Sequence, residues 1–255
     1  MGKVLIKKEK KEFIPELNKT VIVQKAKKYL IEDTDKDYAT EYGIIAHKDF
    51  SKDKAVSSTG KEFFVLEPEF IDYYKRIKRL PQTISLKDIG TIITTCGINK
   101  NSIVAESGTG SAGLTSFLAM VCKKVHSYDI EDAHLELSKK TLEKLKIKNV
   151  VLKKHDIYKN FPVKNVDVVC LDVPEPWHAV KSAMNAVKKG GFIVSYSPCI
   201  TQSMEFVEAV RKEENLLYIK TVETIERAWK IEGKAVRPKS ELSHSAFISF
   251  VRRLG

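Results

Sequence analysis

The chain has 255 residues, of which 43% are hydrophobic and 30% are charged, so it can bury a core and is not a disordered or low-complexity chain. Its 44 Lys and Arg residues outnumber the 33 Asp and Glu residues to give a net charge of +11, which favours a polyanionic partner such as RNA or DNA, with a Lys-rich solvated surface as the alternative. No apolar run suits a membrane span or a signal peptide, so we expect a cytoplasmic protein without a membrane contact. The four Cys residues form no CxxC pair, so we expect reduced cysteines and no metal site.

Residues 1–66 predict a small N-terminal all-β domain. Short stretches rich in β-branched and aromatic residues, at 21–23, 43–46 and 63–66, are separated by polar turns. The start of this segment is strongly basic, because nine Lys and only three Glu occur among the first thirty residues. We therefore expect a β-domain whose surface attracts a polyanion.

Residues 67–85 predict a helical connection. Pro68 suits the first turn of a helix, the acids on either side of it suit the positive N-terminus, and the basic residues at 75–79 suit the C-terminus. The residues with the i, i+3, i+4, i+7 spacing of a buried stripe are Phe70, Tyr73, Tyr74 and Ile77.

From residue 86 to residue 255, strands alternate with helices, which predicts an α/β fold with a parallel, doubly wound sheet. The predicted strands lie at 103–106, 124–129, 149–152, 166–171 and 192–196. The helix-like stretches between them lie at 114–121, 133–145 and 178–187. Two further stretches, 216–221 and 246–251, predict a strand pair that closes the sheet.

The turn after the strand at 103–106 has the spacing of a nucleotide-binding loop. Its glycines, in the order G-x-G-x-x-G, let the backbone approach a ligand closely, and the next helix presents free N–H groups. The residues expected to bind a cofactor here are Glu106, Ser107, Gly108, Thr109, Gly110, Ser111 and Gly113. Asp129, 21 residues after Gly108, is placed to bind ribose hydroxyls. The alternatives are a tight turn without a ligand and an Asp that caps a helix.

Glu106 indicates which cofactor the loop binds. An acid two residues before the first glycine gives the pattern D/E-x-G-x-G, which resembles the first motif of S-adenosylmethionine-dependent methyltransferases. A nicotinamide-dependent oxidoreductase, the alternative, more often has an apolar residue there. The loop therefore favours S-adenosylmethionine.

Acidic residues also follow the third and fourth predicted strands. Asp172 begins the run Asp-Val-Pro-Glu-Pro-Trp at the carboxyl edge of the sheet, where open α/β sheets bind ligands, and the prolines fix the backbone beside it. Asp156 is expected to accept a hydrogen bond from an adenine amino group, with Ile157 against the ring. The alternatives are a rigid structural turn at 172–177 and a surface Asp at 156.

Motifs spread over residues 40–252 resemble those of the archaeal and bacterial tRNA (adenine-N1)-methyltransferases, which form 1-methyladenosine in the T-loop. The matching segments are 57–60, 64–68, 72–73, 78–82, 106–115, 127–129, 172–177, 196–202 and 237–247. The resemblance implies a Rossmann-like class I methyltransferase domain at 86–255, S-adenosyl-L-methionine as cofactor, tRNA as partner and a homotetramer. It also implies that Gln82 and His134 contact the cofactor. The residues it implies for RNA binding are Lys75, Arg76, Lys78, Arg79, Arg237 and His244.

Four positions depart from the family pattern. Ala112 stands where the family often has Gly, and Asp129 stands where Glu is usual. Glu131 replaces a frequent Arg, and Ser85 replaces a frequent aromatic residue. None of these changes removes a group that the reaction needs.

The predicted reaction is direct methyl transfer from S-adenosylmethionine to N1 of an adenine flipped out of the T-loop, at position 58 with position 57 as a second target. Asp172 is the predicted catalytic residue, because a fixed carboxylate can orient the adenine N6 group and later accept a proton. The alternatives are methylation of another tRNA base atom, such as guanine N7 or an exocyclic amine, and a non-catalytic RNA-binding subunit. The presence of Gly108, Gly110, Asp129 and Asp172 argues against the non-catalytic subunit.

Overall fold

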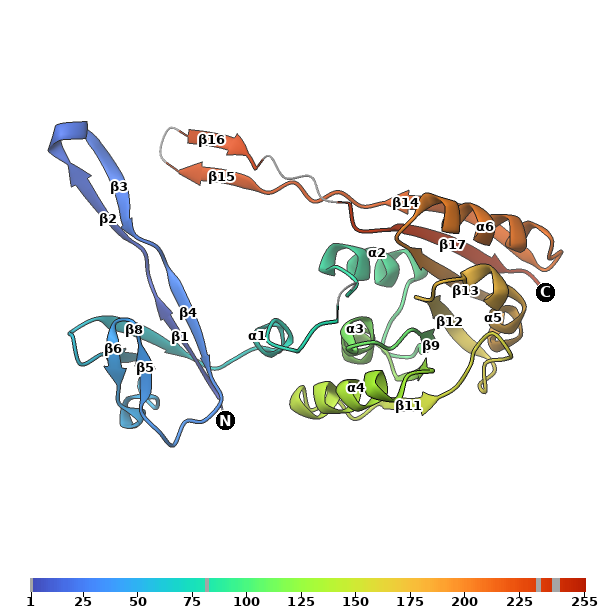
Figure 1. Cartoon of the computed structure of the whole chain (residues 1–255), viewed down its shortest axis with the longest axis horizontal. Helices are drawn as coiled ribbons and strands as arrows, with labels where there is room; N and C mark the ends of the chain where they lie inside the picture. The colour runs from blue at the N-terminus through green and yellow to red at the C-terminus, as the bar shows by residue number, and fades with distance from the viewer. Residues whose placement is uncertain (1, 81–82, 233–234, 240–243) are drawn as a thin grey trace. The chain divides into compact units, whose positions relative to one another are not determined.

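A computed structural model of the protein describes residues 2–80, 83–232, 235–239 and 244–255. The chain divides into two units, of which the N-terminal unit contains Met1–Ile77 with Glu232–Ala235 and the C-terminal unit contains Lys78–Ile231 with Val236–Gly255 (Figure 1). The division between Ile77 and Lys78 falls inside the segment 67–85, which the sequence predicts as a helical connection. Within the described residues, no helix is long and apolar enough to cross a membrane.

The part of the N-terminal unit that precedes α1 (Phe70–Tyr74) is a β-domain around a four-stranded antiparallel sheet with the order β4-β1-β8-β7. The strands of this sheet are β1 (Lys3–Lys7), β4 (Lys27–Ile31), β7 (Lys54–Val56) and β8 (Glu62–Leu66). One hairpin consists of β2 (Lys10–Ile14) and β3 (Lys19–Gln24), and another consists of β5 (Tyr38–Thr40) and β6 (Gly43–Ile45). The two short 3₁₀ helices are η1 (Pro15–Leu17) and η2 (His47–Asp49). Leu5, Phe50 and Phe63 are buried in its core. The predicted small β-domain is confirmed.

In its described residues, the predicted helical connection contains a single short helix, α1 (Phe70–Tyr74). The Asp72 carboxylate accepts a hydrogen bond from the Glu69 backbone N–H at 2.9 Å and so satisfies a donor at the helix start. Of the four residues in the predicted buried stripe, Tyr74 and Ile77 are buried, Phe70 and Tyr73 are partly buried, and Ile77 lies beyond the end of the helix. The helix ends at Tyr74 and Lys75 is its C-cap residue, so the basic residues at 75–79 follow its C-terminus, as predicted, but form no turn of the helix.

The C-terminal unit contains a seven-stranded sheet with the order β11-β10-β9-β12-β13-β17-β14 (Figure 1). Its five parallel strands are β9 (Ile103–Ser107), β10 (Lys124–Asp129), β11 (Val150–Lys154), β12 (Val166–Leu171) and β13 (Val187–Ser197). The last two strands, β14 (Leu216–Glu223) and β17 (Phe247–Arg253), pair with each other antiparallel. Both the predicted parallel sheet and the predicted closing pair are confirmed.

Helices cover both faces of this sheet, and each face has its own core. Helices α2 (Leu86–Cys96) and α3 (Gly113–Val121) pack on one face, and α5 (Val180–Ala186) and α6 (Ile200–Arg211) pack on the other. The remaining elements are α4 (Asp132–Lys144) and the 3₁₀ helix η3 (Pro176–Ala179). The sequence prediction lacks α2 and α6, and it starts β13 at residue 192 although the strand begins at Val187.

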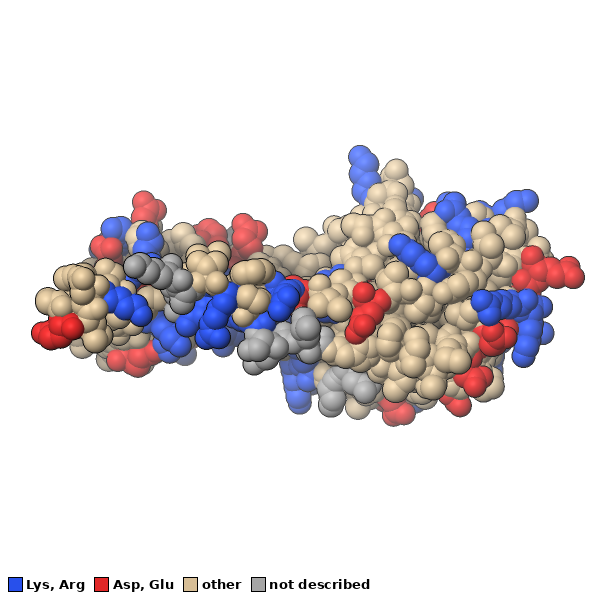
Figure 2. All heavy atoms as spheres, turned by 90° about the horizontal axis from the view of Figure 1, so that it is seen from above, with Lys and Arg blue, Asp and Glu red and all other residues tan. Residues whose placement is uncertain are grey.

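Near the C-terminus, β15 (Trp229–Glu232) and β16 (Ala235–Pro238) form a separate two-stranded sheet. Figure 2 shows Lys and Arg side chains side by side over this hairpin. The basic residues in or beside its described parts are Arg227, Lys230, Arg237 and Lys239. This hairpin is therefore a second basic element, besides the N-terminal β-domain.

Candidate active site

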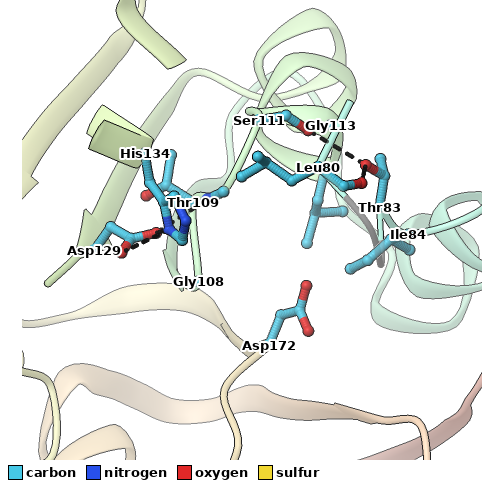
Figure 3. A pocket seen from close by; sticks show the side chains of 12 residues that line it. Leu80, Thr83, Ile84, Gly108, Thr109, Ser111, Gly113, Asp129, His134 and Asp172 are labelled. Carbon is cyan, nitrogen blue, oxygen red and sulfur yellow. Dashed lines mark hydrogen bonds and ion pairs between the residues drawn. The ribbon is translucent and has the colours of Figure 1, made fainter. Parts of the chain in front are cut away.

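A cavity of about 300 Å³ opens where β9, β10 and β12 end (Figure 3). Such a position, at the carboxyl edge of a doubly wound sheet, is where these folds bind nucleotides. The cavity is lined by Leu80, Thr83, Ile84, Gly108, Thr109, Gly110, Ser111, Gly113, Leu114, Asp129, His134 and Asp172. The cavity therefore brings together residues from the glycine turn and from the ends of two further strands.

The glycine turn runs directly against the end of β12. The Asp172 backbone N–H donates to the Ser107 carbonyl oxygen at 2.9 Å, and the Gly108 N–H donates to the Tyr128 carbonyl oxygen at 3.0 Å. Gly108 has φ +88°, and a Cβ atom there would lie 1.8 Å from the Asp172 carbonyl oxygen. Only glycine fits this position, because both its backbone conformation and its surroundings exclude a side chain.

Asp129 joins the glycine turn to the start of α4. Its carboxylate accepts hydrogen bonds at 3.0 Å from the backbone N–H groups of Gly110 and Glu131, and it lies 3.2 Å from His134 Nδ1 (Figure 3). Because Asp129 also lines the cavity, it orders the loop and still borders the space for a ligand. The two sequence-based interpretations, a ligand-binding acid and a capping acid, are therefore compatible.

Glu106 lies beneath the glycine turn and is only 3% exposed. Its carboxylate accepts a hydrogen bond from the Thr115 hydroxyl of α3. Burial, together with the charge of Asp129, raises the pKa of Glu106 to about 7. Glu106 thus attaches the end of β9 to α3, and it is not among the residues that line the cavity.

Asp172 projects into the cavity from the segment that follows β12 (Figure 3). Burial, followed by the charges of Glu106 and Asp129, raises the pKa of Asp172 to about 8. A second cavity, of about 250 Å³, is lined by Thr83, Asp172, Tyr196, Pro198 and Ser245. Asp172 and Thr83 line both cavities, so the Asp172 carboxyl group borders two adjacent ligand-sized spaces.

Several predicted cofactor residues lie outside the first cavity. Asp156 accepts a hydrogen bond from the Tyr158 N–H at 3.1 Å and lies 3.7 Å from Lys159 Nζ. Ile157 is buried in the core beneath α5, and Ser107 is buried in β9. Gln82 lies outside the described residues.

The sequence analysis missed four residues that line the cavity, namely Leu80, Thr83, Ile84 and Leu114. The first three precede α2, and the Thr83 hydroxyl lies 3.3 Å from the Ser111 hydroxyl of the glycine turn. Their one local signal is Ser85, which caps α2 by accepting a hydrogen bond from the Asp88 N–H. A cap marks where the helix begins, but it does not show that the preceding segment faces a ligand.

The predicted RNA-binding residues lie on both units. Lys75, Arg76, Lys78 and Arg79 are exposed, as is Arg237 in β16. His244 is also exposed, but its Nδ1 lies 2.6 Å from Glu223 Oε1 and its Nε2 lies 2.8 Å from the Pro198 carbonyl oxygen. Both hydrogen bonds raise the pKa of His244, and its ring nitrogens are engaged with Glu223 and with Pro198, which lines the second cavity.

Asp129 and Asp172 are the acidic residues that line the first cavity, and Glu106 lies beneath the glycine turn. The raised pKa values of Glu106, about 7, and of Asp172, about 8, mean that both carboxyl groups hold protons over part of the neutral range. A cationic ligand would favour the ionised form of these groups, whereas a pyrophosphate group would oppose it. Within the described residues, no group of three or more His, Cys, Asp or Glu side chains is arranged to hold a metal ion that would reverse this preference. The cavity therefore suits a ligand with positive charge near Asp172.

Comparison with known proteins identifies the family. The model of the tRNA methyltransferase complex GCD14 subunit family matches residues 65–247. The tRNA (adenine(57)-N(1)/adenine(58)-N(1))-methyltransferase TrmI of Methanocaldococcus jannaschii is 34% identical over 92% of this chain and 94% of its own length. The chain belongs to this family. The resemblance inferred from the sequence motifs is thereby confirmed.

Solved structures confirm the methyltransferase fold. An S-adenosylmethionine-dependent O-methyltransferase from Thermotoga maritima matches 99% of this chain and 93% of its own, with a TM-score of 0.83 and 25% identity. The tRNA (m1A58) methyltransferase TrmI of Aquifex aeolicus matches 99% of this chain and 97% of its own, with a TM-score of 0.76 and 24% identity. Because the two names differ in the methyl acceptor, the fold alone does not select the substrate.

Proposed function

We propose that this protein transfers the methyl group of S-adenosylmethionine to N1 of an adenine in the T-loop of tRNA, at position 58 with position 57 as a second target. Its family and the position of Asp172 between two adjacent cavities support this function. One cavity would hold the methyl donor and the other the acceptor base. We further propose that the enzyme is a cytoplasmic homotetramer, as the resemblance to the family implies.

The residues around the first cavity fit S-adenosylmethionine. This cofactor supplies a methyl group on a positively charged sulfur. The glycine turn would bind it through backbone groups of residues 108–113, and Asp129 would accept hydrogen bonds from its ribose hydroxyls. A cation near Asp172 lowers the pKa of that carboxyl group, so Asp172 would lose its proton when the donor cavity is filled.

The second cavity would hold the flipped adenine. Extruding a base from a folded loop costs a few kcal/mol, and no strong base is needed because the neutral N1 atom is already nucleophilic. Asp172 would orient the N6 group and later accept a proton from the positively charged product. The attraction between that charge and a carboxylate about 4 Å away is about 4 kcal/mol at an effective dielectric constant of about 20. Holding donor and acceptor in line would contribute about 7–11 kcal/mol, which is the larger effect.

The basic residues outside the cavities would hold the tRNA backbone. The exposed run Lys75, Arg76, Lys78 and Arg79 would contact phosphates, as would Arg237, and these contacts position RNA without reading its sequence. The contact of His244 with RNA stays a prediction. Such binding weakens steeply with salt, because counterions are released from the phosphates.

A methylation assay tests the function directly. The protein is incubated with labelled S-adenosylmethionine and an unmodified tRNA transcript, the RNA is digested, and the methylated nucleoside and its position are identified. Labelled 1-methyladenosine in the T-loop is the expected product. Another labelled nucleoside would keep the fold and cofactor but assign a different base atom. Cofactor binding without transfer would contradict autonomous catalysis and favour the non-catalytic subunit.

A further inference from the structure

Asp88 is a buried carboxylate that the reaction described above does not use. It lies in the first turn of α2 and is 0% exposed. Four side-chain donors converge on it: Ser245 Oγ at 2.7 Å, Ser85 Oγ at 2.8 Å, Lys87 Nζ at 3.0 Å and Tyr196 Oη at 3.2 Å. A buried charge with this many donors holds segments that are far apart in the sequence, here α2, the end of β13 and the residues before β17.

Two of these donors belong to the wall of the second cavity. Tyr196 and Ser245 line that cavity together with Asp172, whereas Asp88 itself does not line it. Ser245 also accepts a hydrogen bond from Lys87 Nζ at 2.5 Å, so both its proton and one of its lone pairs are engaged. Asp88 therefore fixes two wall residues of the space proposed for the acceptor base.

The protonation states follow from the same contacts. Burial alone would raise the pKa of Asp88. Hydrogen bonds from Ser245, Lys87 and Ser85 outweigh burial and lower this pKa below its ordinary value, so Asp88 stays ionised. Burial and the charges of Asp88 and Asp172 raise the pKa of Tyr196, so its hydroxyl keeps its proton and donates it to Asp88. The oxygen atoms of Tyr196 and Ser245 then have only acceptor lone pairs left for a ligand.

We propose that Asp88 is a positioning residue that sets the hydrogen-bonding polarity of the acceptor cavity, so that its wall accepts and does not donate. A wall of acceptors pairs with the N6 amino group of adenine and repels the O6 atom of guanine, which is itself an acceptor. This inference rests on the proposed function, because it takes the second cavity as the adenine site. It assigns the choice of the amino-bearing base to a residue that does not touch the base.

The test compares two tRNA transcripts, one with adenosine and one with purine riboside, which lacks the N6 amino group, at the T-loop target. The quantity measured is the ratio of kcat/KM for the two transcripts in each variant. The lower intrinsic reactivity of purine N1 is the same for every variant, so it cancels when the ratios are compared. A merely structural defect lowers both rates and leaves the ratio unchanged.

For wild-type protein we expect adenosine to be preferred by about tenfold or more, because removing the N6 amino group leaves buried acceptors unpaired. In Asp88→Asn the amide donates as well as accepts, so the two hydroxyls are free to donate into the cavity, and the ratio should fall several-fold. Affinity for S-adenosylmethionine should stay within about twofold, since Asp88 is outside the first cavity.

Ser85→Ala is the matched control, because it removes one of the hydrogen bonds to Asp88 without altering the cavity wall. It should lower the melting temperature slightly and keep the wild-type ratio. Tyr196→Phe removes the acceptor oxygen itself and should lower the ratio even if Asp88→Asn fails to fold. If Asp88→Asn folds and keeps the wild-type ratio, the inference is overturned. If Asp88→Asn does not fold, a wild-type ratio in Tyr196→Phe overturns it instead. Absence of methylation by the wild-type protein on adenosine would instead overturn the proposed function.

Discussion

The two units of the molecule differ in how far their charged side chains are exposed to solvent. In the N-terminal unit most charged side chains lie on the surface, with Lys7 a buried exception, and an ion pair such as Lys27 with Glu41, at 3.1 Å, has both side chains about half exposed. In the C-terminal unit Asp129 and Asp172 line one cavity, Glu106 is buried beneath the glycine turn, and burial raises the pKa of Glu106 and Asp172. An exposed ion pair contributes about 0–1 kcal/mol, whereas changing one member of a buried group of charges has a much larger effect.

This difference suits the two ligands that the enzyme is proposed to bind. A tRNA backbone carries many phosphates and is attracted by many weak, interchangeable contacts. A small cation in a cavity is held by a few fixed groups that have no substitutes. Single substitutions should therefore have large effects at the cavity, and only combined substitutions should have clear effects on the basic surface.

The largest effect is expected at Asp172. Asp172→Asn keeps the size of the side chain but removes its charge, so we expect kcat to fall by about 100- to 1,000-fold while cofactor binding stays measurable. Single-turnover transfer to tRNA measures this decrease. Glu175→Gln, which neutralises an exposed acid in the same segment, is the matched control and should keep nearly full activity. Unchanged turnover in Asp172→Asn would remove Asp172 from the reaction.

The next largest effect is expected at Gly108. Gly108→Ala places a Cβ atom 1.8 Å from a backbone oxygen, so the turn must move and cofactor affinity should fall by about 100-fold or more. Gly97→Ala is the control, because Gly97 also has a positive φ, +63°, but has no atom within 4 Å of the added Cβ. Its cost should be only the backbone strain of about 1–2 kcal/mol. Equal melting temperatures and cofactor affinities for the two variants would show that crowding at Gly108 is unimportant.

Much of the central sheet could be predicted from the sequence, because its buried strands are short apolar runs followed by turn residues. The helices α2 and α6 could not be predicted as easily. In α2 the run Ile92, Ile93, Thr94 and Thr95 is β-branched and resembles a strand, although Ile89, Ile92 and Cys96 are buried at helical spacing between the Ser85 cap and Gly97. Tertiary packing of that face decides in favour of the helix.

The residues of the candidate site also fall into a group that the sequence could indicate and a group that it could not. Gly108, Asp129 and Asp172 stand in local motifs at strand ends, so their shared location follows from the order of strands and helices. Tyr196 and Ser245 stand in segments that match the family pattern, but neither segment shows that these residues meet Thr83, because they come together only where distant segments pack. A local pattern therefore indicates where the first group lies but not that the second group lines a cavity.

The basic surface should respond to combined changes. Replacing Lys75, Arg76 and Lys78 with Gln removes three exposed charges, and we expect tRNA affinity at low salt to fall by about 10- to 100-fold. The slope of log Kd against log salt should decrease by about one for each phosphate that the variant no longer binds. Filter binding across a salt series measures both quantities. The control is a variant with the same net charge, in which Gln replaces Lys123, Lys139 and Lys140. An equal decrease in tRNA affinity in this control would mean that the position of the removed charges does not matter for tRNA binding.

The smallest effect is expected in the pH dependence of cofactor binding. With a pKa of about 8, Asp172 holds its proton below that pH in the free protein, whereas a cationic ligand favours the ionised form. The affinity for S-adenosylmethionine should therefore rise with pH up to about 8, by at most about tenfold per pH unit, and then level off.

S-adenosylhomocysteine, whose sulfur is neutral, is the control ligand and should show a smaller rise in affinity. The ratio of the two affinities removes the titration of groups that affect both ligands equally. Asp172→Asn should remove most of the pH dependence of this ratio, and the titration of Glu106, with a pKa of about 7, accounts for the part that remains. Calorimetric titrations from pH 6 to pH 9 measure the ratio, and a pH-independent ratio in the wild-type protein would mean that Asp172 does not face the charged sulfur.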